Sequence, residues 1–340
     1  MSLATKYRPL KFEDVCDQST IIKILKRQLE LQTYSNCYLF TGPSGCGKTT
    51  LARIFANKIN NGIGMPIEID GASNNGVDNV RNIITEATER SIESEYKIYI
   101  IDECHLITLA GWNAFLKCIE EPPVHTIFIF CTTNPEKIPE TIMNRVMVFN
   151  LTKIKTDHIK TRLLQICNAE NFINYTEACE YIAKVSNGGM RDAIAMLEKC
   201  SNYDTDLSIT NVLDCLGGIT YDTLFSLTNA CIDRNDRVVI NIIETLYDKG
   251  LDLKLFVDQY IDFILDLTKY CHFKDMTLLR VPASFENDVK YATSFGEAGE
   301  NKSYFSKVLA QLLNLKLNLR LDNNSKSTVE ITLINICRGI

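Results

Sequence analysis

The sequence lacks several features that would place it in a special class of protein. No apolar run approaches membrane-spanning length, and the first six residues have no signal-peptide core, so we expect a cytoplasmic protein without membrane contact. No repeat, low-complexity linker or long disordered tail is evident in the 340 residues. Its length of 340 residues is enough for two or three domains with well-filled cores.

An excess of positive charge is also missing. The sequence has 36 Lys and Arg against 42 Asp and Glu, and its formal net charge of −6 argues against a general basic coat for nucleic acid. Contact with DNA through helix ends and a few basic side chains stays open. The 13 cysteines include no Cys-x-x-Cys pair, and most lie in apolar runs, where they act as small buried hydrophobes. Composition alone names no function.

What the sequence does contain is a phosphate-binding loop at residues 42–49. The loop fits the pattern Gly-x4-Gly-Lys-Ser/Thr without a mismatch, between a predicted strand at 37–40 and a predicted helix. Its glycines turn successive N–H groups inward, and the N-terminus of the helix faces the phosphates. We expect Lys48 to reach the β- and γ-phosphates of ATP, and Thr49 to hold Mg²⁺. The predicted nucleotide-binding residues here are Gly42, Pro43, Ser44, Gly45, Cys46, Gly47, Lys48, Thr49 and Thr50.

Polar residues at two later strand ends complete this predicted site. Residues 98–101 predict a strand buried on both faces, and Asp102 and Glu103 follow it directly. We expect Asp102 to hold Mg²⁺ and Glu103 to orient and polarise the attacking water. Residues 126–131 predict another buried strand, and Thr133 follows it. Because ligands gather at the carboxyl ends of strands in an open α/β sheet, Thr133 is placed to hydrogen-bond the γ-phosphate or the water.

Two weaker interpretations concern polar residues near helix starts. His105 completes Asp-Glu-Cys-His and is interpreted as a polar residue at the start of a helix. Asn75, Gly76 and Arg81 surround the start of a helix that opens at Val77, and its exposed N–H groups could accept a DNA phosphate. An ordinary helix cap is the alternative for Asn75, Gly76 and Arg81, whereas His105 superficially resembles a helicase motif whose companion motifs are absent.

The periodicity of the sequence changes after residue 151. Before this point strands alternate with helices, which is typical of a parallel α/β sheet, and after it the pattern is helical. We therefore predict an α/β domain at 1–151, a three-helix lid at 152–215 and an all-α domain at 216–340. Arg191 begins the third helix of the predicted lid.

This layout resembles the AAA+ clamp-loader ATPases, and among them the bacterial DNA polymerase III gamma/tau subunits. The resemblance covers about the first 200 residues, whereas the last third matches only in helical character. The matching residues are Tyr7-Arg8-Pro9 with Phe12, the 42–49 loop, Ile69–Ser73, Asp102–His105, Asn113–Lys117, Glu120–Pro123, Thr132-Thr133, Arg145 and Gly188–Ala193.

The resemblance implies roles that the residues alone do not. By it, Tyr7-Arg8-Pro9 brackets the adenine and Thr133 is sensor 1. Arg191 is sensor 2, which touches the γ-phosphate of its own ATP and links the lid to the nucleotide. Arg145 is the arginine finger, which acts on ATP held by the neighbouring subunit.

The resemblance also implies partners. These are a ring of about five subunits joined by the C-terminal helices, with several copies of this chain, a sliding clamp and primer–template DNA. Such a loader opens the clamp when ATP is bound, recognises the primer–template duplex, and releases the closed clamp after hydrolysis. ATP, clamp and DNA each favour the same assembled state, so their binding is reciprocally coupled.

Three departures from the family pattern carry expectations of their own. Residues 60–66 stand where these subunits usually carry a four-cysteine zinc module, so we predict no structural zinc. The usual Ser-Arg-Cys of the finger is Asn144-Arg145-Val146 here, so its positioning partner is expected to differ. The sequence stops at the predicted collar, and we expect no polymerase-binding tail. Our hypothesis is a streamlined form, of bacterial or viral origin, in the cytoplasm of a bacterial or virus-infected bacterial cell.

Two alternatives stay open beside the motor subunit of a loader. One is another AAA+ ATPase of DNA repair or recombination, against which the Glu-Glu-Pro-Pro helix end and the helical collar argue. The other is a nucleotide-holding structural subunit of the loader. Such subunits have degraded phosphate loops, whereas Lys48, Thr49, Asp102 and Glu103 are all present here, so we expect hydrolysis.

Overall fold

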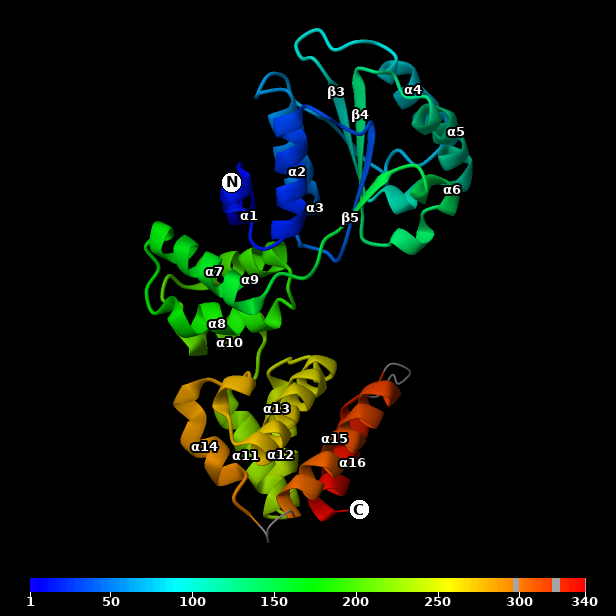
Figure 1. Ribbon diagram of the computed structural model, residues 1–340. Coiled ribbons are helices and arrows are strands. Elements are labelled where there is room, and N and C mark those ends of the chain that lie inside the picture. Colours follow the sequence, from blue (N-terminus) through cyan, green and yellow to red (C-terminus); the bar gives the residue numbers. More distant parts are fainter. Residues whose placement is uncertain (296–299, 320–324, 340) are drawn as a thin grey trace. The chain divides into compact units, whose positions relative to one another are not determined.

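The computed structural model describes residues 1–295, 300–319 and 325–339 (Figure 1). The chain divides into two compact units, which are described separately: residues 1–170 with 182–198, and residues 171–181 with 199–340. The three-domain division expected from the sequence stays a prediction.

The first unit contains a five-stranded parallel sheet in the order β2-β3-β4-β1-β5. Its strands are β1 (Cys37–Thr41), β2 (Ile67–Asp70), β3 (Lys97–Asp102), β4 (Thr126–Thr132) and β5 (Met147–Asn150). The predicted parallel α/β sheet is therefore confirmed. Because β1, β4 and β3 are neighbours and run in one direction, their carboxyl ends lie together at one edge of the sheet.

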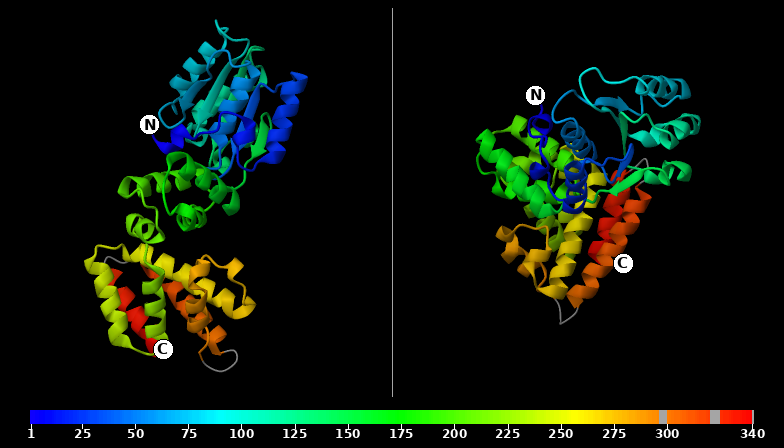
Figure 2. Two further views of the ribbon diagram at one scale, coloured as in Figure 1. Left: turned by 90° about the vertical axis from the view of Figure 1, so that its left-hand side faces the viewer. Right: turned by 45° about the horizontal axis from the view of Figure 1, so that its top comes forward.

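Two hydrophobic cores flank this sheet. Helices α2 (Ser19–Leu31) and α3 (Lys48–Ile59) cover one face, and α4 (Val77–Ala87) and α5 (Leu109–Glu120) cover the other (Figures 1 and 2). Along β3, Ile98 and Ile100 pack toward α2 and α3, whereas Tyr99 and Ile101 pack toward α4 and α5. Because helices cover both faces of β3, the middle of this strand is apolar, and the carboxylates of Asp102 and Glu103 stand at its carboxyl end.

Further elements complete the first unit. They are α1 (Leu3–Lys6), η1 (Phe12–Asp14), η2 (Cys104–Leu106), η3 (Pro135–Lys137), α6 (Glu140–Met143) and α7 (Thr156–Glu170). Helices α8 (Tyr175–Val185) and α9 (Met190–Tyr203) each contribute residues to both units. The sequence predicts three helices after the sheet with Arg191 at the start of the third, and α7, α8 and α9 follow β5 with Arg191 as the second residue of α9.

The second unit is helical. Its elements are α10 (Ile209–Leu216), α11 (Tyr221–Ile232), α12 (Asp236–Asp248), α13 (Leu253–Phe273), η4 (Met276–Leu278), η5 (Ala283–Phe285), α14 (Glu286–Ala292), α15 (Glu300–Asn318) and α16 (Ser325–Arg338). One core unites the elements from α11 onward around the apolar face of α13, which buries Phe263, Ile264 and Leu267. Within the described ranges, none of the helices combines the length and the apolar character needed to cross a bilayer.

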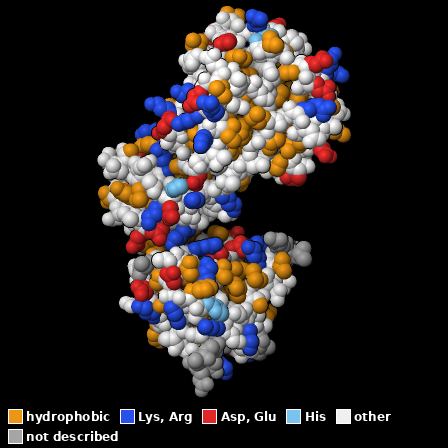
Figure 3. Space-filling model, in the orientation of Figure 1, with side chains coloured by type: hydrophobic (Ala, Val, Ile, Leu, Met, Phe, Trp, Pro, Cys, Tyr) orange, Lys and Arg blue, Asp and Glu red, His pale blue; other side chains and the backbone are white. Residues whose placement is uncertain are grey.

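The burial of the cysteines and the mixing of charged side chains can be compared with the expectations from the sequence. All of the 13 cysteines except Cys16 and Cys215 are buried, which confirms their interpretation as core residues. On the face shown in Figure 3, Lys and Arg side chains are interspersed with Asp and Glu. That face therefore carries no continuous basic field.

Candidate functional site

The phosphate loop joins β1 to α3, and its shape depends on glycines at positive φ. Gly42, Gly45 and Gly47 have φ values of +145°, +70° and +103°. Gly47 is the N-cap of α3 and brings no side chain to the first N–H groups of that helix, so these donors are available to a ligand. The Gly45 carbonyl accepts a hydrogen bond from the Met190 N–H at 3.0 Å, which connects the loop to the start of α9.

Lys48 is buried at the start of α3, with only 7% of the residue exposed. Its Nζ donates to the carbonyl oxygens of Gly42 and Pro43, each at 2.9 Å. In the described part of the chain no carboxylate pairs with this ammonium group. A buried cation that faces only carbonyl oxygens is suited to an anionic ligand such as a polyphosphate.

Thr49 and Asp102 lie side by side at the ends of different elements. Thr49 Oγ1 donates to Asp102 Oδ2 at 2.8 Å, and the Glu103 N–H donates to Asp102 Oδ1 at 3.0 Å. A hydroxyl and a carboxylate are hard oxygen donors, and such donors beside a phosphate site fit Mg²⁺. Elsewhere in the described ranges, no three His, Cys, Asp or Glu side chains gather as metal ligands do.

Glu103 occupies a left-handed backbone conformation, with φ +46° and ψ +40°. This is uncommon outside glycine, and it turns the chain sharply after β3. The Glu103 Oε2 accepts a hydrogen bond from Thr133 Oγ1 at 3.2 Å. The neighbouring strand ends therefore bring together the two residues that the sequence placed near the γ-phosphate.

His105 lies in the short 3-10 helix η2, at a helix start as the sequence suggested, and it also has contacts that the sequence did not predict. The turn at Glu103 folds it back, so that its Nδ1 lies 3.2 Å from Glu103 Oε2 and 3.1 Å from Thr132 Oγ1. Only 10% of the His105 side chain is exposed. No local sequence signal reveals this contact, because it depends on β3 and β4 being neighbours.

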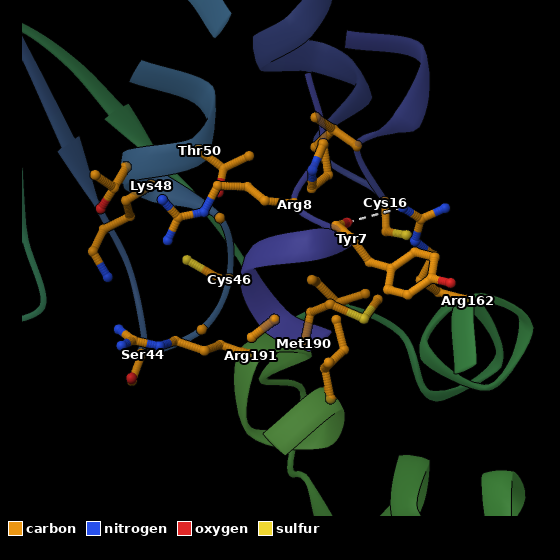
Figure 4. Close-up of a pocket in the computed structure, with 18 of the residues that line it drawn as sticks. Tyr7, Arg8, Cys16, Ser44, Cys46, Lys48, Thr50, Arg162, Met190 and Arg191 are labelled. Atoms are coloured by element: carbon orange, nitrogen blue, oxygen red, sulfur yellow. Dashed lines mark hydrogen bonds between the residues drawn. The ribbon is translucent and has the colours of Figure 1, made fainter. Parts of the chain in front are cut away.

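One pocket of the first unit collects most of the predicted nucleotide-binding residues (Figure 4). The predicted residues that line it are Tyr7, Arg8, Pro9, Ser44, Gly45, Cys46, Gly47, Lys48, Thr49, Thr50, Asp102, Glu103 and Arg191. Gly42 and Pro43 contribute through their carbonyl contacts with Lys48. Residues that sequence reasoning missed also line the pocket, among them Val15, Cys16, Ile154, Arg162, Met190 and Ile194.

The N-terminal arm is fastened to α7. Lys6 Nζ donates to Glu170 Oε1 at 2.6 Å, the Tyr7 hydroxyl donates to the same oxygen, and Arg162 donates to the Tyr7 carbonyl at 3.0 Å. The hydrogen bonds from Lys6 and Tyr7 lower the pKa of the Glu170 carboxyl. In Figure 4 the Tyr7 ring lies on the same side of the pocket as Arg162.

Arg8 extends in the other direction, toward Thr50 and the phosphate loop (Figure 4). No carboxylate within the described residues forms a hydrogen bond or ion pair with its guanidinium. Burial and then the nearby Arg53 lower the pKa of Arg8. With Lys48 and Arg191 in the same pocket, Arg8 adds to a concentration of positive charge that suits an anion.

Arg145 does not line this pocket. Its Nε forms an ion pair with Glu120 Oε1 at 2.8 Å, its Nη1 donates to the Thr141 carbonyl at 2.7 Å, and 40% of its side chain is exposed. Glu120, at the end of α5, is therefore the partner that positions Arg145 in this chain.

The three candidate DNA-contacting residues lie around the start of α4, outside the pocket lining. Asn75 and Arg81 are exposed, and Arg81 Nη1 pairs with Asp78 Oδ1 at 3.3 Å. Gly76 is the N-cap of α4, and no side chain caps the helix there. A role in DNA binding stays a prediction.

Comparisons with known proteins agree with this architecture. A family model described as "DNA polymerase III, delta subunit" matches residues 65–155. The DNA polymerase III subunit tau of Bacillus subtilis is 32% identical over 98% of this chain. The DNA polymerase III subunit gamma of Buchnera aphidicola is 28% identical, and the match covers 99% of this chain and 99% of that protein. The chain belongs to the gamma/tau family of AAA+ clamp-loader subunits.

This gamma/tau family member spans 62% of the Bacillus subtilis protein and 50% of the gamma/tau subunit of Mycoplasma genitalium. Among solved structures, a RuvB protein of Thermotoga maritima, titled a Holliday junction branch migration motor, superposes with a TM-score of 0.53. The match has 21% identity and covers 66% of this chain and 79% of that one, and it shows the AAA+ fold. Membership of the AAA+ ATPases implies a nucleotide site, and the pocket around Lys48 has the chemistry for one.

Proposed function

We propose that this gamma/tau family member is an ATP-hydrolysing motor subunit of a sliding-clamp loader, acting with Mg²⁺. The observation that carries the proposal is the convergence of Lys48, Thr49, Asp102, Glu103 and Arg191 on one pocket. These residues come from the phosphate loop, the end of β3 and the start of α9, so the pocket has cations, metal ligands and a candidate base together. A subunit that only held nucleotide would not need this set.

Each side chain has a proposed task at the phosphates. Lys48 and the uncapped N–H groups of α3 bind the β- and γ-phosphates, and Thr49 and Asp102 hold Mg²⁺. When bound by these two residues, Mg²⁺ would supply positive charge beside the transferred phosphoryl group. Glu103 orients and polarises water, and Thr133 assists at the γ-phosphate side through its contact with Glu103.

Two connections would transmit nucleotide binding to the helices after the sheet. Tyr7-Arg8-Pro9 brackets the adenine, and Tyr7 is tied to Glu170 of α7. At the phosphate end, Gly45 is tied to Met190, next to Arg191, the proposed sensor of the γ-phosphate. Both ends of the nucleotide are therefore linked to the position of α7 and α9, which is the coupling that a motor requires.

Arg145 is proposed to act on ATP held by a neighbouring subunit. Its absence from the lining of its own pocket and its exposure support this role, and the ion pair with Glu120 holds the guanidinium in position. An arginine supplied in this way stabilises the charge of the transition state. The proposal thus requires a ring, which we take to contain about five subunits with several copies of this chain, as the clamp-loader resemblance implies.

The remaining partners are the sliding clamp and primer–template DNA, with Asn75, Gly76 and Arg81 as candidate DNA contacts at the start of α4. The uncapped N–H groups of this helix are suited to a phosphate. The mixed charge on the face shown in Figure 3, with the formal net charge of −6, argues for such local contacts rather than a general basic coat. A place in the cytoplasm of a bacterial or virus-infected cell stays a prediction.

The deciding experiment measures the rate of ATP hydrolysis by the chain co-expressed with its genomic neighbours, with and without primed DNA and the cognate clamp. Strong stimulation by DNA and clamp together is expected for a loader motor. Stimulation by DNA alone would favour a repair or recombination ATPase. A near-zero rate under every condition, with nucleotide still bound, would favour a nucleotide-holding structural subunit.

A further inference from the structure

Asp17 and Gln18 are two consecutive residues in the left-handed region of backbone conformation, with φ values of +59° and +58°. Residues other than glycine adopt this region rarely and at a cost in free energy, so two in succession persist only where other contacts hold them. Gln18 is the N-cap of α2, but its side chain does not cap that helix. Both side chains instead form hydrogen bonds to residues 151–155, the segment that joins β5 to α7.

Gln18 forms a bridge of two hydrogen bonds to the backbone of Thr152. Its Nε2 donates to the Thr152 carbonyl at 2.7 Å, and its Oε1 accepts a hydrogen bond from the Thr152 N–H at 3.3 Å. Only 8% of Gln18 is exposed, so the bridge replaces hydrogen bonds to water that the buried amide has lost. Gln18 and Thr152 are 134 positions apart, and the bridge therefore fastens two distant parts of the first unit.

Asp17 fastens the same segment at its other end. Its Oδ2 accepts a hydrogen bond from the Lys155 N–H at 2.8 Å, and its Oδ1 lies 2.7 Å from Nδ1 of His158, in the first turn of α7. The Asp17 side chain is 15% exposed. Together, Asp17 and Gln18 hold the 151–155 segment near its beginning and at its end.

The two segments that are fastened in this way both reach the nucleotide pocket. Val15 and Cys16, immediately before the left-handed turn, line the pocket, and so does Ile154, within the bridged segment. In Figure 4 Cys16 lies on the same side of the pocket as Tyr7, and Lys48 lies on the opposite side. This apolar wall suits the nucleoside part of a nucleotide rather than its phosphates.

We propose that Asp17 and Gln18 are positioning residues that hold the two halves of this apolar wall in the arrangement that accepts the nucleoside part of ATP. Without their contacts the two halves can separate, and the pocket is complete in only a fraction of the molecules. The apparent nucleotide affinity falls in proportion to that fraction. The phosphate contacts lie on the other side of the pocket, so hydrolysis is retained once ATP is bound. This inference rests on the proposed ATPase function and adds two residues to it.

The test uses substitutions that keep the left-handed turn and remove the side-chain contacts. Gln18→Gly and Asp17→Gly do so, because glycine adopts positive φ without strain. Asp17→Asn retains an acceptor oxygen for the Lys155 N–H, and asparagine tolerates the left-handed region. Gln32→Gly is the matched control, since Gln32 has φ +51° and an exposed side chain at the other end of α2. Each variant is assayed in the subunit assembly for ATP affinity, KM and kcat.

The loss of two hydrogen bonds between the segments changes the fraction of complete pockets by on the order of tenfold. We therefore expect Gln18→Gly and Asp17→Gly to weaken ATP binding and raise KM by about tenfold, with kcat at saturating ATP close to that of the wild type. Asp17→Asn should recover most of the affinity, and Gln32→Gly should bind ATP as the wild type does. Wild-type affinity in Gln18→Gly would overturn the inference, as would a loss confined to kcat.

A second variant decides if Gln18→Gly does not fold. Gln18→Glu keeps the length of the side chain and the acceptor for the Thr152 N–H, but it sets a carboxylate oxygen against the Thr152 carbonyl in place of a donor. The same tenfold loss of ATP affinity is expected in this variant. Wild-type affinity in it would contradict the positioning role.

Binding and hydrolysis by the wild-type assembly separate failure of this inference from failure of the proposed function. If the wild type neither binds nor hydrolyses ATP, the proposed function and the inference fail together. If the wild type does both, and the glycine variants at positions 17 and 18 match it in affinity and KM, the ATPase stands and only the role of Asp17 and Gln18 is wrong.

Discussion

Gly71 is where a single added methyl group would most directly disturb the predicted catalytic carboxylates. It follows β2 and packs against the end of β3, where its N–H donates to the Asp102 carbonyl at 2.8 Å. A Cβ at this position would lie 2.8 Å from the carbonyl oxygens of both Asp102 and Glu103. Ordinary contacts begin at 3.4 Å, so the backbone of one element must retreat by about 0.6 Å.

The consequence of Gly71→Ala follows from that shift. Since about 1 Å of misplacement can cost on the order of 10²-fold, we expect kcat for ATP hydrolysis to fall by roughly tenfold. Overpacking should also lower the free energy of unfolding of the first unit by about 1–3 kcal/mol. Nucleotide affinity should change less than kcat, because the phosphate loop itself is untouched.

The assay is steady-state ATP hydrolysis by the assembled subunits, with thermal unfolding of the same samples. Ala72→Ser is the control, because it adds one heavy atom at the next residue, whose side chain is exposed. It should change neither quantity. A Gly71→Ala variant with the wild-type kcat and unfolding temperature would refute the reasoning, since the close approach would then impose no constraint on Asp102 and Glu103.

Four further predictions test other contacts. Lys48→Ala should abolish nucleotide binding, and binding measured at concentrations that saturate the wild type would contradict the site. Arg145→Ala should leave nucleotide binding intact but cut turnover of the assembly by on the order of 10³–10⁵-fold; unchanged turnover would exclude the finger role. Glu170 has a lowered pKa, so its contribution to stability is complete above its ordinary pKa of 4.5 and is lost as pH falls through the lower folded value. The unfolding temperature of Glu170→Gln should therefore approach that of the wild type below this pH and lie under it above; a pH-independent difference would argue against the contact. Asp266 is 1% exposed, accepts hydrogen bonds from the N–H groups of Arg280 and Val281, and forms an ion pair with Lys269. Asp266→Ala should therefore lower the free energy of unfolding of the second unit, measured in urea, by about 2–4 kcal/mol. A decrease of less than about 1 kcal/mol would contradict this.

The elements that could be predicted from the sequence are those encoded in contiguous residues. The phosphate loop is one continuous motif, and its glycines have the positive φ values that such a turn requires. Strand β4, Thr126–Thr132, lies where the apolar run at 126–131 predicted a strand, because such a run is a local signal. The apolar run before Asp102 similarly predicted a strand buried on both faces, which β3 is. Family resemblance then supplied roles for Arg145 and Arg191, which local pattern does not encode and which are still to be tested.

Only the tertiary structure decided how these pieces restrain one another. Tyr7 and Glu170 are 163 positions apart and meet because the N-terminal arm lies against α7. His105 contacts Glu103 only because a left-handed turn folds it against the end of β4. Strand order sets which chain ends are neighbours, and it is fixed by the packing of the whole sheet rather than by any short segment. The sequence by itself therefore predicted which residues carry the chemistry, and the fold determined which of them are neighbours and what holds them in position.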